Sequence, residues 1–544
     1  MTSSPHTPSR PTPSQRPPTG QAPARPAHRG PVLIALMMAM ALSAMDNTIV
    51  STAIPQVVRD LGGFSLFSWV FSGYLLTQTV SIPVYGKLAD LWGRKPILIA
   101  GTIIFLAGSA LSAAAWSMVS LIGFRALQGL GAGSIMATVN TLAGDMYDLE
   151  ERGRVQGYLS SVWGISAVFG PTLGGSLAQY VSWRWIFLIN LPLGAVALTL
   201  ISKFLREKVT RRRHRIDVAG ATTVLIAAGA LIFGLLQGGT AWPWLSPQSI
   251  AVFAVAAVAA VAAALIEQRA AEPIVPPWFW RRRVLTGSGL AALGLGLLVM
   301  GPSTLLPTYG QAVLGLGAVA AGAVLAAMSV GWPVASAVSA RFFLRIGFRD
   351  TEIVGAAVCL AAVAFGWLAT IGQPTVWEPV VSTLVLGFGL GLISVCTVVA
   401  PQSTVSWEQR GVVTGTVMFC RYLGQSLGAA VFGAIFNAAI SGKLAAAPAS
   451  LRGELPHQIG NVGNVLGLTR GNGPVAVYLR DAVSLGIRHV YLGLAVVALG
   501  TLAVAMVVPR RFSTAAGATA DAPVAPQQDA AGGTDGAAAG PGGR

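Results

Sequence analysis

Residues 86–96 read GKLADLWGRKP, and an apolar run flanks them on each side, over residues 66–86 and 96–115. Each run has about 20 residues, the length that a helix needs to cross the roughly 30 Å hydrocarbon core of a membrane. The charged segment is therefore predicted to be a turn between two membrane-spanning helices. Of the 544 residues, 53% are hydrophobic and 10% are charged, whereas soluble proteins average about 25% charged residues. This composition excludes a water-soluble fold.

The same alternation of apolar runs and polar turns continues along the chain and predicts an all-α membrane protein with fourteen spans. The predicted spans cover residues 31–54, 66–86, 96–115, 117–141, 155–180, 183–204, 217–238, 248–267, 284–308, 317–340, 351–371, 377–401, 412–440 and 489–509. A chain of this kind forms one polytopic membrane unit and not a series of soluble domains.

Positive charges orient the spans, because loops on the cytoplasmic side retain Lys and Arg. With the N-terminus inside, most of the 36 Lys and Arg residues fall on the cytoplasmic side. The dense clusters within 211–215 and 281–283 lie inside, whereas the predicted outer loops 239–247 and 309–316 carry no charge. Residues 441–488 are predicted to form a long external loop. We therefore expect a multi-pass protein of the cytoplasmic membrane with both termini in the cytoplasm.

The ends of the chain and its rarer residues exclude other classes of function. Residues 1–30 and 512–544 are rich in Pro, Ala and Gly and are predicted to be disordered cytoplasmic tails. The formal charge of +16 is spread over short clusters between spans, which argues against nucleic-acid binding. The three cysteines and five histidines show no metal-ligand or catalytic spacing. Neither a metal site nor an enzyme is expected.

Three ionisable residues lie deep inside predicted spans, far from either end, where a charge costs several kcal/mol (about 3 or more) unless it has a partner. They are Asp46, Arg125 and Arg421. Asp46 lies roughly 22 Å from the inner end of its helix, and Arg125 lies roughly 12 Å from the outer end of its own. Both therefore fall in the outer half of the membrane and are expected to share one cavity. Arg421 lies about 14 Å from the inner side.

We interpret these three residues as the proton-coupling and substrate-cavity site, with Asp46 as the group that carries the proton. A buried carboxyl group is able to alternate between charged and neutral forms, whereas an arginine stays protonated and adjusts the pKa of its neighbour. The alternative for Asp46 is a hydrogen bond that only holds two helices together.

The span 155–180 is rich in small residues and contains one proline. Small side chains let two helices approach closely, and proline bends a helix because it lacks the backbone N–H. The positions concerned are Gly157, Ser166, Gly170, Pro171, Gly174 and Gly175. The alternative is an ordinary glycine-rich membrane helix.

The turn at 86–96 has its own pattern of glycines and charges. Its glycines allow a tight turn and close helix packing, and its acid at a helix end is expected to pair with an arginine. The residues are Gly86, Asp90, Gly93, Arg94 and Lys95. The corresponding turn of the second half, residues 341–349, reads RFFLRIGFR and lacks the acid. The simpler interpretation is a basic cytoplasmic loop.

Taken together, these motifs resemble those of the Major Facilitator Superfamily. The turn at 86–96, the string RALQGLGAG at 125–133, SWRWIFLINLPLG at 182–194 and RYLGQSLG at 421–428 are similar to the fourteen-helix drug:proton antiporters, a family that includes multidrug exporters. The departures from the family pattern are Ser51, Leu91 and Ser166.

The resemblance extends over about residues 31–511 and implies two bundles of six helices. The bundles are residues 31–204 and 284–511, and two additional helices lie within 205–283. The resemblance also implies that the turn at 86–96 latches one conformation and that the glycine and proline motif of span 155–180 is that of an antiporter.

The expected function is export of small drug-like molecules, hydrophobic or cationic, in exchange for protons. The protein is expected to act as a monomer in the lipid bilayer, without a cofactor, using the proton gradient. One alternative is a proton-coupled symporter that imports its substrate on the same fold. Another is a membrane receptor or scaffold without transport, although buried charges such as Asp46 and Arg125 disfavour it.

Overall fold

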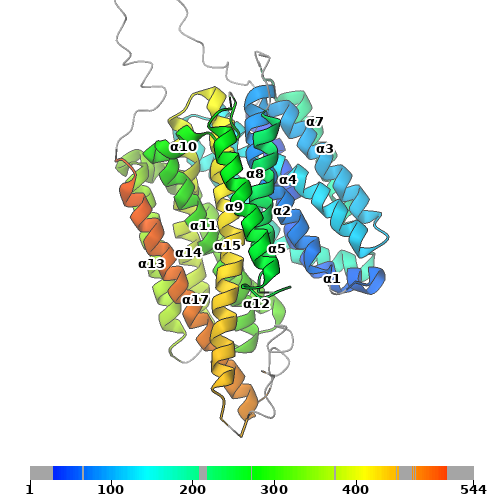
Figure 1. Cartoon of the computed structure of the whole chain (residues 1–544), viewed down its shortest axis with the longest axis vertical. Helices are drawn as coiled ribbons and strands as arrows, with labels where there is room; N and C mark the ends of the chain where they lie inside the picture. The colour runs from blue at the N-terminus through cyan, green and yellow to red at the C-terminus, as the bar shows by residue number, and fades with distance from the viewer. Residues whose placement is uncertain are drawn as a thin grey trace, which may run out of the picture.

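The computed structural model describes residues 29–63, 66–207, 217–239, 241–270, 272–372, 375–448, 450–451, 469, 471 and 473–510. Within these ranges the chain is helical and forms no named strand (Figure 1). Residues 1–28 and 511–544, which include nearly all of the predicted tails, the basic cluster within 211–215 and residues 452–468 of the predicted outer loop lie outside the described residues. The helices of the first half are α1 (Arg29–Leu61), α2 (Ser68–Trp92), α3 (Arg94–Ala113), α4 (Met118–Met146), α5 (Leu149–Tyr180), α6 (Trp185–Leu188) and α7 (Asn190–Phe204).

The remaining helices comprise a central pair and a second bundle. The pair is α8 (Val218–Gln237) and α9 (Pro247–Glu267). The second half contains α10 (Pro277–Arg281), α11 (Arg283–Ala312), α12 (Ala318–Ile346), α13 (Phe348–Ala369), α14 (Trp377–Ser403), the short 3₁₀ helix η2 (Trp407–Gln409), α15 (Arg410–Ala445) and α17 (Pro474–Val507). In chain order, the central pair therefore lies between the helices of the first half and those of the second.

Each of the fourteen predicted spans corresponds to a long helical segment, the sixth being α6 followed by α7. Twelve of these segments are long and apolar enough to cross a membrane by themselves. The other two are α2 and α5, which pack between the bundles and carry more small and polar residues. Helices that face other helices on several sides need less apolar surface than helices that face lipid.

The last helix is longer than the sequence predicts. The predicted span begins at residue 489, whereas α17 begins at Pro474, so part of the predicted outer loop is helical. Arg480 and Asp481 interrupt the apolar run there, but Leu479, Ala482 and Val483 are buried on one face of the helix. An amphipathic helix end of this kind has no continuous apolar run.

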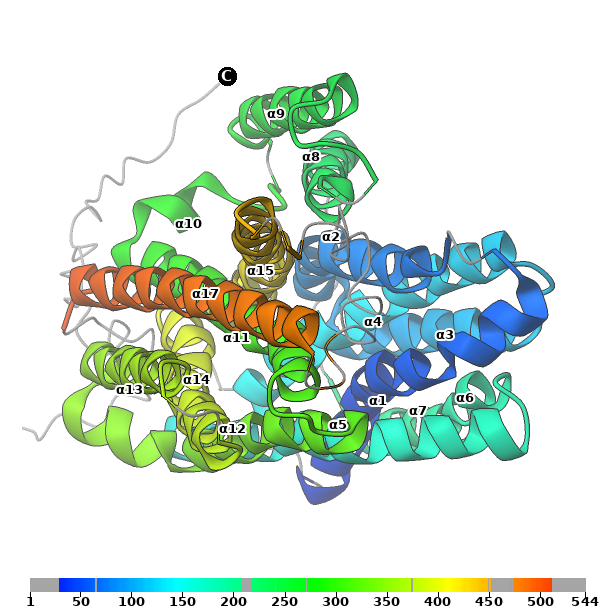
Figure 2. The same cartoon turned by 90° about the horizontal axis from the view of Figure 1, so that it is seen from below.

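Two pairs of helices join the halves. Seen from below, α2 lies beside α15 and α5 lies beside α12, while α8 and α9 lie on the outside (Figure 2). α8 packs against both α2 and α15, and α9 packs only on α8 among its major contacts. The central pair therefore covers one side of the boundary between the bundles without separating them.

The contacts between the halves gather toward one end of the molecule. There, Gly86 of α2 packs on Gly411 and Gly415 of α15, and Gly153 of α5 packs on Ala340 of α12. This end also carries the turn between α2 and α3. The charge pattern of the loops predicts that this end faces the cytoplasm.

Candidate functional site

Asp46 and Arg125 form a fully buried ion pair inside the first bundle. The exposed fraction is 1% for Asp46 and 0% for Arg125. The Arg125 guanidinium donates to Asp46 Oδ2, and the side-chain amide of Gln128 donates to Asp46 Oδ1 over 2.8 Å. The amide of Asn190 lies 3.5 Å from the same oxygen. The depth argument from the sequence therefore predicted correctly that the two charged residues lie at the same level.

A second set of contacts surrounds the pair. The Arg125 guanidinium lies over the ring of Tyr74, 4.2 Å from its centroid, and donates through Nε to the Val70 carbonyl oxygen. The Tyr74 hydroxyl is 3.0 Å from the hydroxyl of Ser43, which precedes Asp46 on α1. Buried charges are tolerated when such hydrogen bonds and cation–π contacts compensate them. A change in the charge of Asp46 therefore alters the strength of the hydrogen bonds and of the cation–π contact that Arg125 forms.

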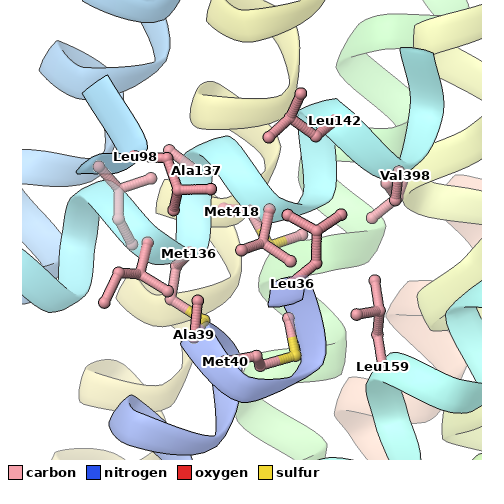
Figure 3. Close-up of a cluster of buried hydrophobic side chains, with 14 of the residues drawn as sticks. Leu36, Ala39, Met40, Leu98, Met136, Ala137, Leu142, Leu159, Val398 and Met418 are labelled. Atoms are coloured by element: carbon pink, nitrogen blue, oxygen red, sulfur yellow. The ribbon is translucent and has the colours of Figure 1, made fainter. Parts of the chain in front are cut away.

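A cavity of about 250 Å³ lies between the bundles. Helices α1, α4 and α5 line it from the first half, and α11, α12, α14 and α15 line it from the second. Much of its wall is apolar and flexible, with the methionines Met40, Met136, Met300, Met328 and Met418. Figure 3 shows Met40, Met136 and Met418 near one another in the buried apolar cluster to which they also belong. Methionine side chains adapt to ligands of different shape.

Aromatic and polar side chains complete the wall. The aromatic residues are Trp163, Trp332 and Tyr422, and the larger polar residues are Asn140, Gln156, Gln425 and Arg421. Among the described lining residues Arg421 carries the only formal charge, and no Asp or Glu is among them.

The structure separates two groups of residues that the sequence placed in one cavity. Arg421 lines the cavity, but Asp46 and Arg125 do not. The reason is the pitch of α1, because successive residues turn by about 100°. Thr48 therefore lies on nearly the opposite face from Asp46 and reaches the cavity wall, whereas Asp46 points into the bundle.

Asp90 joins the end of α2 to the beginning of α15. Its carboxylate accepts hydrogen bonds from the backbone N–H groups of Gly411 and Val412 over 2.8 and 2.7 Å, and from Arg94 over 2.8 Å. A carboxylate at a helix N-terminus satisfies orphan N–H groups and interacts favourably with the helix dipole. The predicted pairing of Asp90 with an arginine is confirmed, and the pair also binds the opposite half of the protein.

Arg94 extends this latch to α4 and η2. Its Nε lies 3.1 Å from Asp145, and its guanidinium stacks 3.6 Å from the ring centroid of Trp407. Asp145 in turn pairs with Arg410 over 3.0 Å, again across the two halves. Burial raises the pKa of Asp90 to about 7, against the opposing effects of Arg94 and the two backbone donors.

The other turn residues have distinct roles. A Cβ atom on Gly86 would lie 2.6 Å from the Gly411 carbonyl oxygen, so only glycine permits this approach. Gly93 has φ 96° and ψ 154°, a conformation that is essentially restricted to glycine. Lys95 lies outside the latch and donates through Nζ to the Ser202 carbonyl oxygen of α7.

The small residues of α5 contact two different neighbours. Gly157 packs on Ala337 of α12, where an added Cβ would lie 2.8 Å from the alanine Cβ. Further along, the Ser166 carbonyl oxygen accepts a hydrogen bond from Thr48 of α1, and Gly170 and Gly174 approach that same helix. The motif therefore packs α5 against the opposite half at one end and within its own bundle at the other.

Two positions of this motif have no such packing role. A Cβ atom on Gly175 would meet nothing within 4 Å, and Pro171 is exposed on a helix that continues through it.

Several residues of the site were not predicted from the sequence. Gln128 lies three residues after Arg125, and this spacing on one helical face is a signal that a search for polar partners would find. Asp145 and Arg410 are far apart in the chain and had no signal of pairing. The cavity methionines are indistinguishable in sequence from residues that face lipid. Within the described ranges, no group of three His, Cys, Asp or Glu side chains is arranged to hold a metal ion.

Comparison with known proteins identifies relatives over most of the chain. The family model of the Major Facilitator Superfamily matches residues 36–429. The chain is 32% identical over 473 residues to "Multidrug resistance protein 3" of Bacillus subtilis (strain 168), covering 85% of this chain and 91% of that protein. It is 34% identical over 410 residues to "Multidrug transporter protein MdtP" of the same organism, covering 75% of each. "Efflux pump dotC" of Dothistroma septosporum (strain NZE10 / CBS 128990) is 31% identical over 396 residues, with 71% of this chain and 68% of that protein covered.

Solved structures share the fold at low sequence identity. The human organic anion transporter MFSD10 (TETRAN) superimposes with a TM-score of 0.59 at 15% identity, covering 88% of this chain and all (100%) of that one. A bacterial homologue of the iron transporter ferroportin, in an outward-facing state, gives a TM-score of 0.57 at 11% identity, with coverages of 86% and 99%.

Proposed function

The chain belongs to the Major Facilitator Superfamily and is a multi-pass membrane transporter, and on that premise we propose that it is a proton-coupled antiporter that exports drug-like small molecules. It resides in the cytoplasmic membrane with both termini in the cytoplasm. It works as a monomer, without a cofactor, by alternating access. The similarity to proteins named as multidrug transporters and efflux pumps supports export, and the charge distribution of the loops supports the orientation.

The single observation that carries the coupling proposal is the buried Asp46–Arg125 pair. A carboxyl group that exchanges one proton must be able to exist in both forms, and its charged form must be compensated within the membrane. Arg125, Gln128 and Asn190 provide that compensation. Protonation of Asp46 would neutralise the carboxylate and weaken its ion pair with Arg125. The Arg125 guanidinium would then be free to form other hydrogen bonds.

The pair lies within reach of the cavity through two tyrosines. Tyr74 stacks under Arg125, and Tyr422 lines the cavity from the opposite half. The two tyrosines belong to one buried cluster, and the helices that carry them, α2 and α15, pack against each other. A change at Asp46 therefore has a short route of packed side chains to the cavity wall and to α15.

The latch supports alternating access. With Asp90 bonded to the N-terminus of α15, the bundles are held together at the end that the sequence places in the cytoplasm. This arrangement corresponds to a form closed toward the cytoplasm. Breaking the latch would let the bundles separate there and expose the cavity to the inner side, as in rocking transporters.

The test is uphill efflux from cells and inverted vesicles that contain the protein. In inverted vesicles with an acidic interior, the parent should accumulate a fluorescent drug, and an uncoupler should abolish the accumulation. Asp46→Asn should abolish it as well, because an amide cannot alternate between charged and neutral forms, while downhill exchange survives. Asp481→Asn is the matched control, since Asp481 is exposed on α17, and it should accumulate drug at the parent rate.

The same assay separates the alternatives. Accumulation by Asp46→Asn at the parent rate would remove Asp46 as the coupling group. A symporter would release the drug from the same vesicles together with protons, and a receptor or scaffold would show no flux that depends on the pH gradient.

A further inference from the structure

Arg421 is an unusual residue of the cavity wall because its charge is not paired with an acid in the part of the chain that the structure describes. Among the described residues no carboxylate forms an ion pair with it, and its Nε is buried without a hydrogen bond. Its closest specific contact is the ring of Trp332, with the guanidinium 4.9 Å from the ring centroid. By contrast, Arg125 and Arg94, which are both 0% exposed, are paired: Arg125 bonds to Asp46, and Arg94 bonds to Asp90 and Asp145.

An unpaired guanidinium in the membrane interior is costly, and such groups mark functional positions. Arg421 already faces a cavity, so a ligand can supply the missing partner there. Guanidinium groups bind carboxylates through two parallel hydrogen bonds, and these charge-assisted bonds strengthen where water is excluded. The side-chain amide of Gln425, one helical turn further along α15, lines the same cavity and adds a neutral donor.

The rest of the wall sets the shape of the ligand. Trp163, Trp332 and Tyr422 provide flat apolar surfaces, and several methionines fill the space between them. With no acid among the described lining residues, a cationic ligand would meet an unscreened positive charge and no compensating carboxylate. The apolar wall suits aromatic ligands of any charge. Arg421 therefore determines whether an anionic, neutral or cationic ligand binds best.

We infer that the cavity selects amphiphilic organic anions, meaning molecules with a carboxylate or similar acid group on an aromatic body, and that Arg421 binds the acid group. The inference rests on the proposed transport function and names the substrate class of the same cavity. It keeps the expectation of a hydrophobic substrate and replaces the expected positive charge by a negative one.

The test uses three probes that share one ring system. These are 1-naphthaleneacetic acid, its amide and 2-(1-naphthyl)ethylamine, which are anionic, neutral and cationic at pH 7.4. Their affinities for the purified chain in lipid nanodiscs are measured by competition against tritiated 1-naphthaleneacetic acid and by calorimetry. The acid should bind at least about tenfold more tightly than the amide, the effect expected of one charge-assisted pair, and the amine should bind most weakly.

Variants of Arg421 assign this preference to one residue. Arg421→Gln should bring the affinities for acid and amide within about twofold of each other while leaving the amide affinity close to that of the parent. Arg421→Lys should retain part of the preference. Arg480→Gln is the control, because Arg480 lies on α17 outside the cavity, and it should keep the parent order.

Two outcomes would overturn the inference. One is equal affinity of the parent for acid and amide, or tighter binding of the amine. This measurement uses the parent alone, so it tests the inference even if Arg421→Gln fails to fold. The other is a folded Arg421→Gln variant that keeps the tenfold preference. Vesicle transport separates this inference from the proposed function: proton-driven movement of the amide or amine without a preference for the acid contradicts only the inference. Binding of the acid through Arg421 without proton-driven transport contradicts only the antiport proposal.

Discussion

The turn between α2 and α3 and the turn between α12 and α13 have the same backbone but different side chains. Gly93 has φ 96° and ψ 154°, and Gly347 has φ 88° and ψ 164°. The first turn holds Asp90 and Arg94 in an ionic network. In the second, the rings of Phe343 and Phe348 stack 4.6 Å apart.

Each turn meets a helix of the opposite half, and again the chemistry differs. The first turn meets the N-terminus of α15, whose own N-cap residue, Gln409, forms no side-chain cap, so Asp90 caps it from the other half. The second packs near Leu149 at the start of α5. That helix is capped by its own Asp148, in a capping box with Glu151.

Both halves of the fold use the same glycine turn, whereas the acid Asp90 is present in the first turn alone. The turn geometry and the ionic contact to the opposite half are therefore separate features. Hydrogen bonds from Asp90 to α15 are directional, and water can replace them when the bundles separate. The stacked phenylalanines contact each other within the second half, and their packing near Leu149 of α5 is apolar and non-directional. We therefore expect conformational switching to depend on the first turn more than on the second.

The largest expected effect is that of Asp90→Asn. The change replaces one acceptor oxygen by an NH₂ donor that faces the N–H groups of Gly411, Val412 and Arg94. At least one hydrogen bond of the latch is then lost and a buried donor is left unpaired, at a cost of about 1–3 kcal/mol. Uphill efflux per molecule should fall about tenfold or more, with membrane expression retained. The measurement is the initial rate in inverted vesicles, normalised to the amount of protein.

Phe343→Leu is the corresponding change in the second turn. Aromatic pairs contribute about 0.5–1.5 kcal/mol, and this pair lies within one half, so efflux should fall by less than about fivefold. Equal losses for the two variants would show that the turns share one role and would break the comparison.

A smaller effect, equal in both turns, is expected from Gly93→Ala and Gly347→Ala. Both glycines occupy a backbone region that costs other residues about 1–3 kcal/mol. Each substitution should therefore lower the melting temperature of the purified protein by a similar amount, as followed by thermal unfolding in detergent. The control is Gly322→Ala on α12, where an added Cβ meets nothing within 4 Å and the backbone is helical, so no loss is expected. A loss at Gly93 alone would mean that the second turn is only superficially similar.

The sequence predicted the fold well because lipid imposes a simple rule. Apolar runs of fixed length report helices directly, and all fourteen were found, including α2 and α5, which are less apolar than the rest. The start of α17 was missed because an amphipathic end breaks the run without breaking the helix. Helix bounds therefore follow from hydropathy only where both faces of a helix are apolar.

The site was predicted less completely, because depth along a helix is easier to derive than direction around it. Asp46 and Arg125 were placed at one level, and they touch. Their separation from the cavity of Arg421 depends on which way α1 faces, and that is set by packing between helices far apart in sequence. The pairing of Asp145 with Arg410 depends on the same long-range packing.

The smallest expected effect concerns pH, and it applies to the first turn alone. Asp90 lies beyond residue 86, where the predicted membrane span ends, and burial in the closed latch raises its pKa to about 7. The charged groups that face it are Arg94, which opposes this rise, and Asp145, which adds to it. When the latch opens, water reaches the carboxyl group and its pKa returns toward the usual value of about 4.

Closing the latch therefore takes up a proton at pH values between about 4 and 7. Across this window, lower pH stabilises the closed form and rising pH destabilises it. Above about pH 7 Asp90 is ionised in both forms, and the equilibrium between them no longer changes with pH. Spin labels on Trp92→Cys and Arg345→Cys, both exposed and on opposite halves, would report the distance between the two halves at the end that carries the latch. The three native cysteines are buried and should label poorly. The closed population should decrease from pH 5 to pH 7 in the parent and stay constant in Asp90→Asn, because the amide does not titrate. A parent distance that is independent of pH would show that Asp90 keeps one protonation state in both forms, and the ionic turn would then differ from the aromatic turn in strength alone.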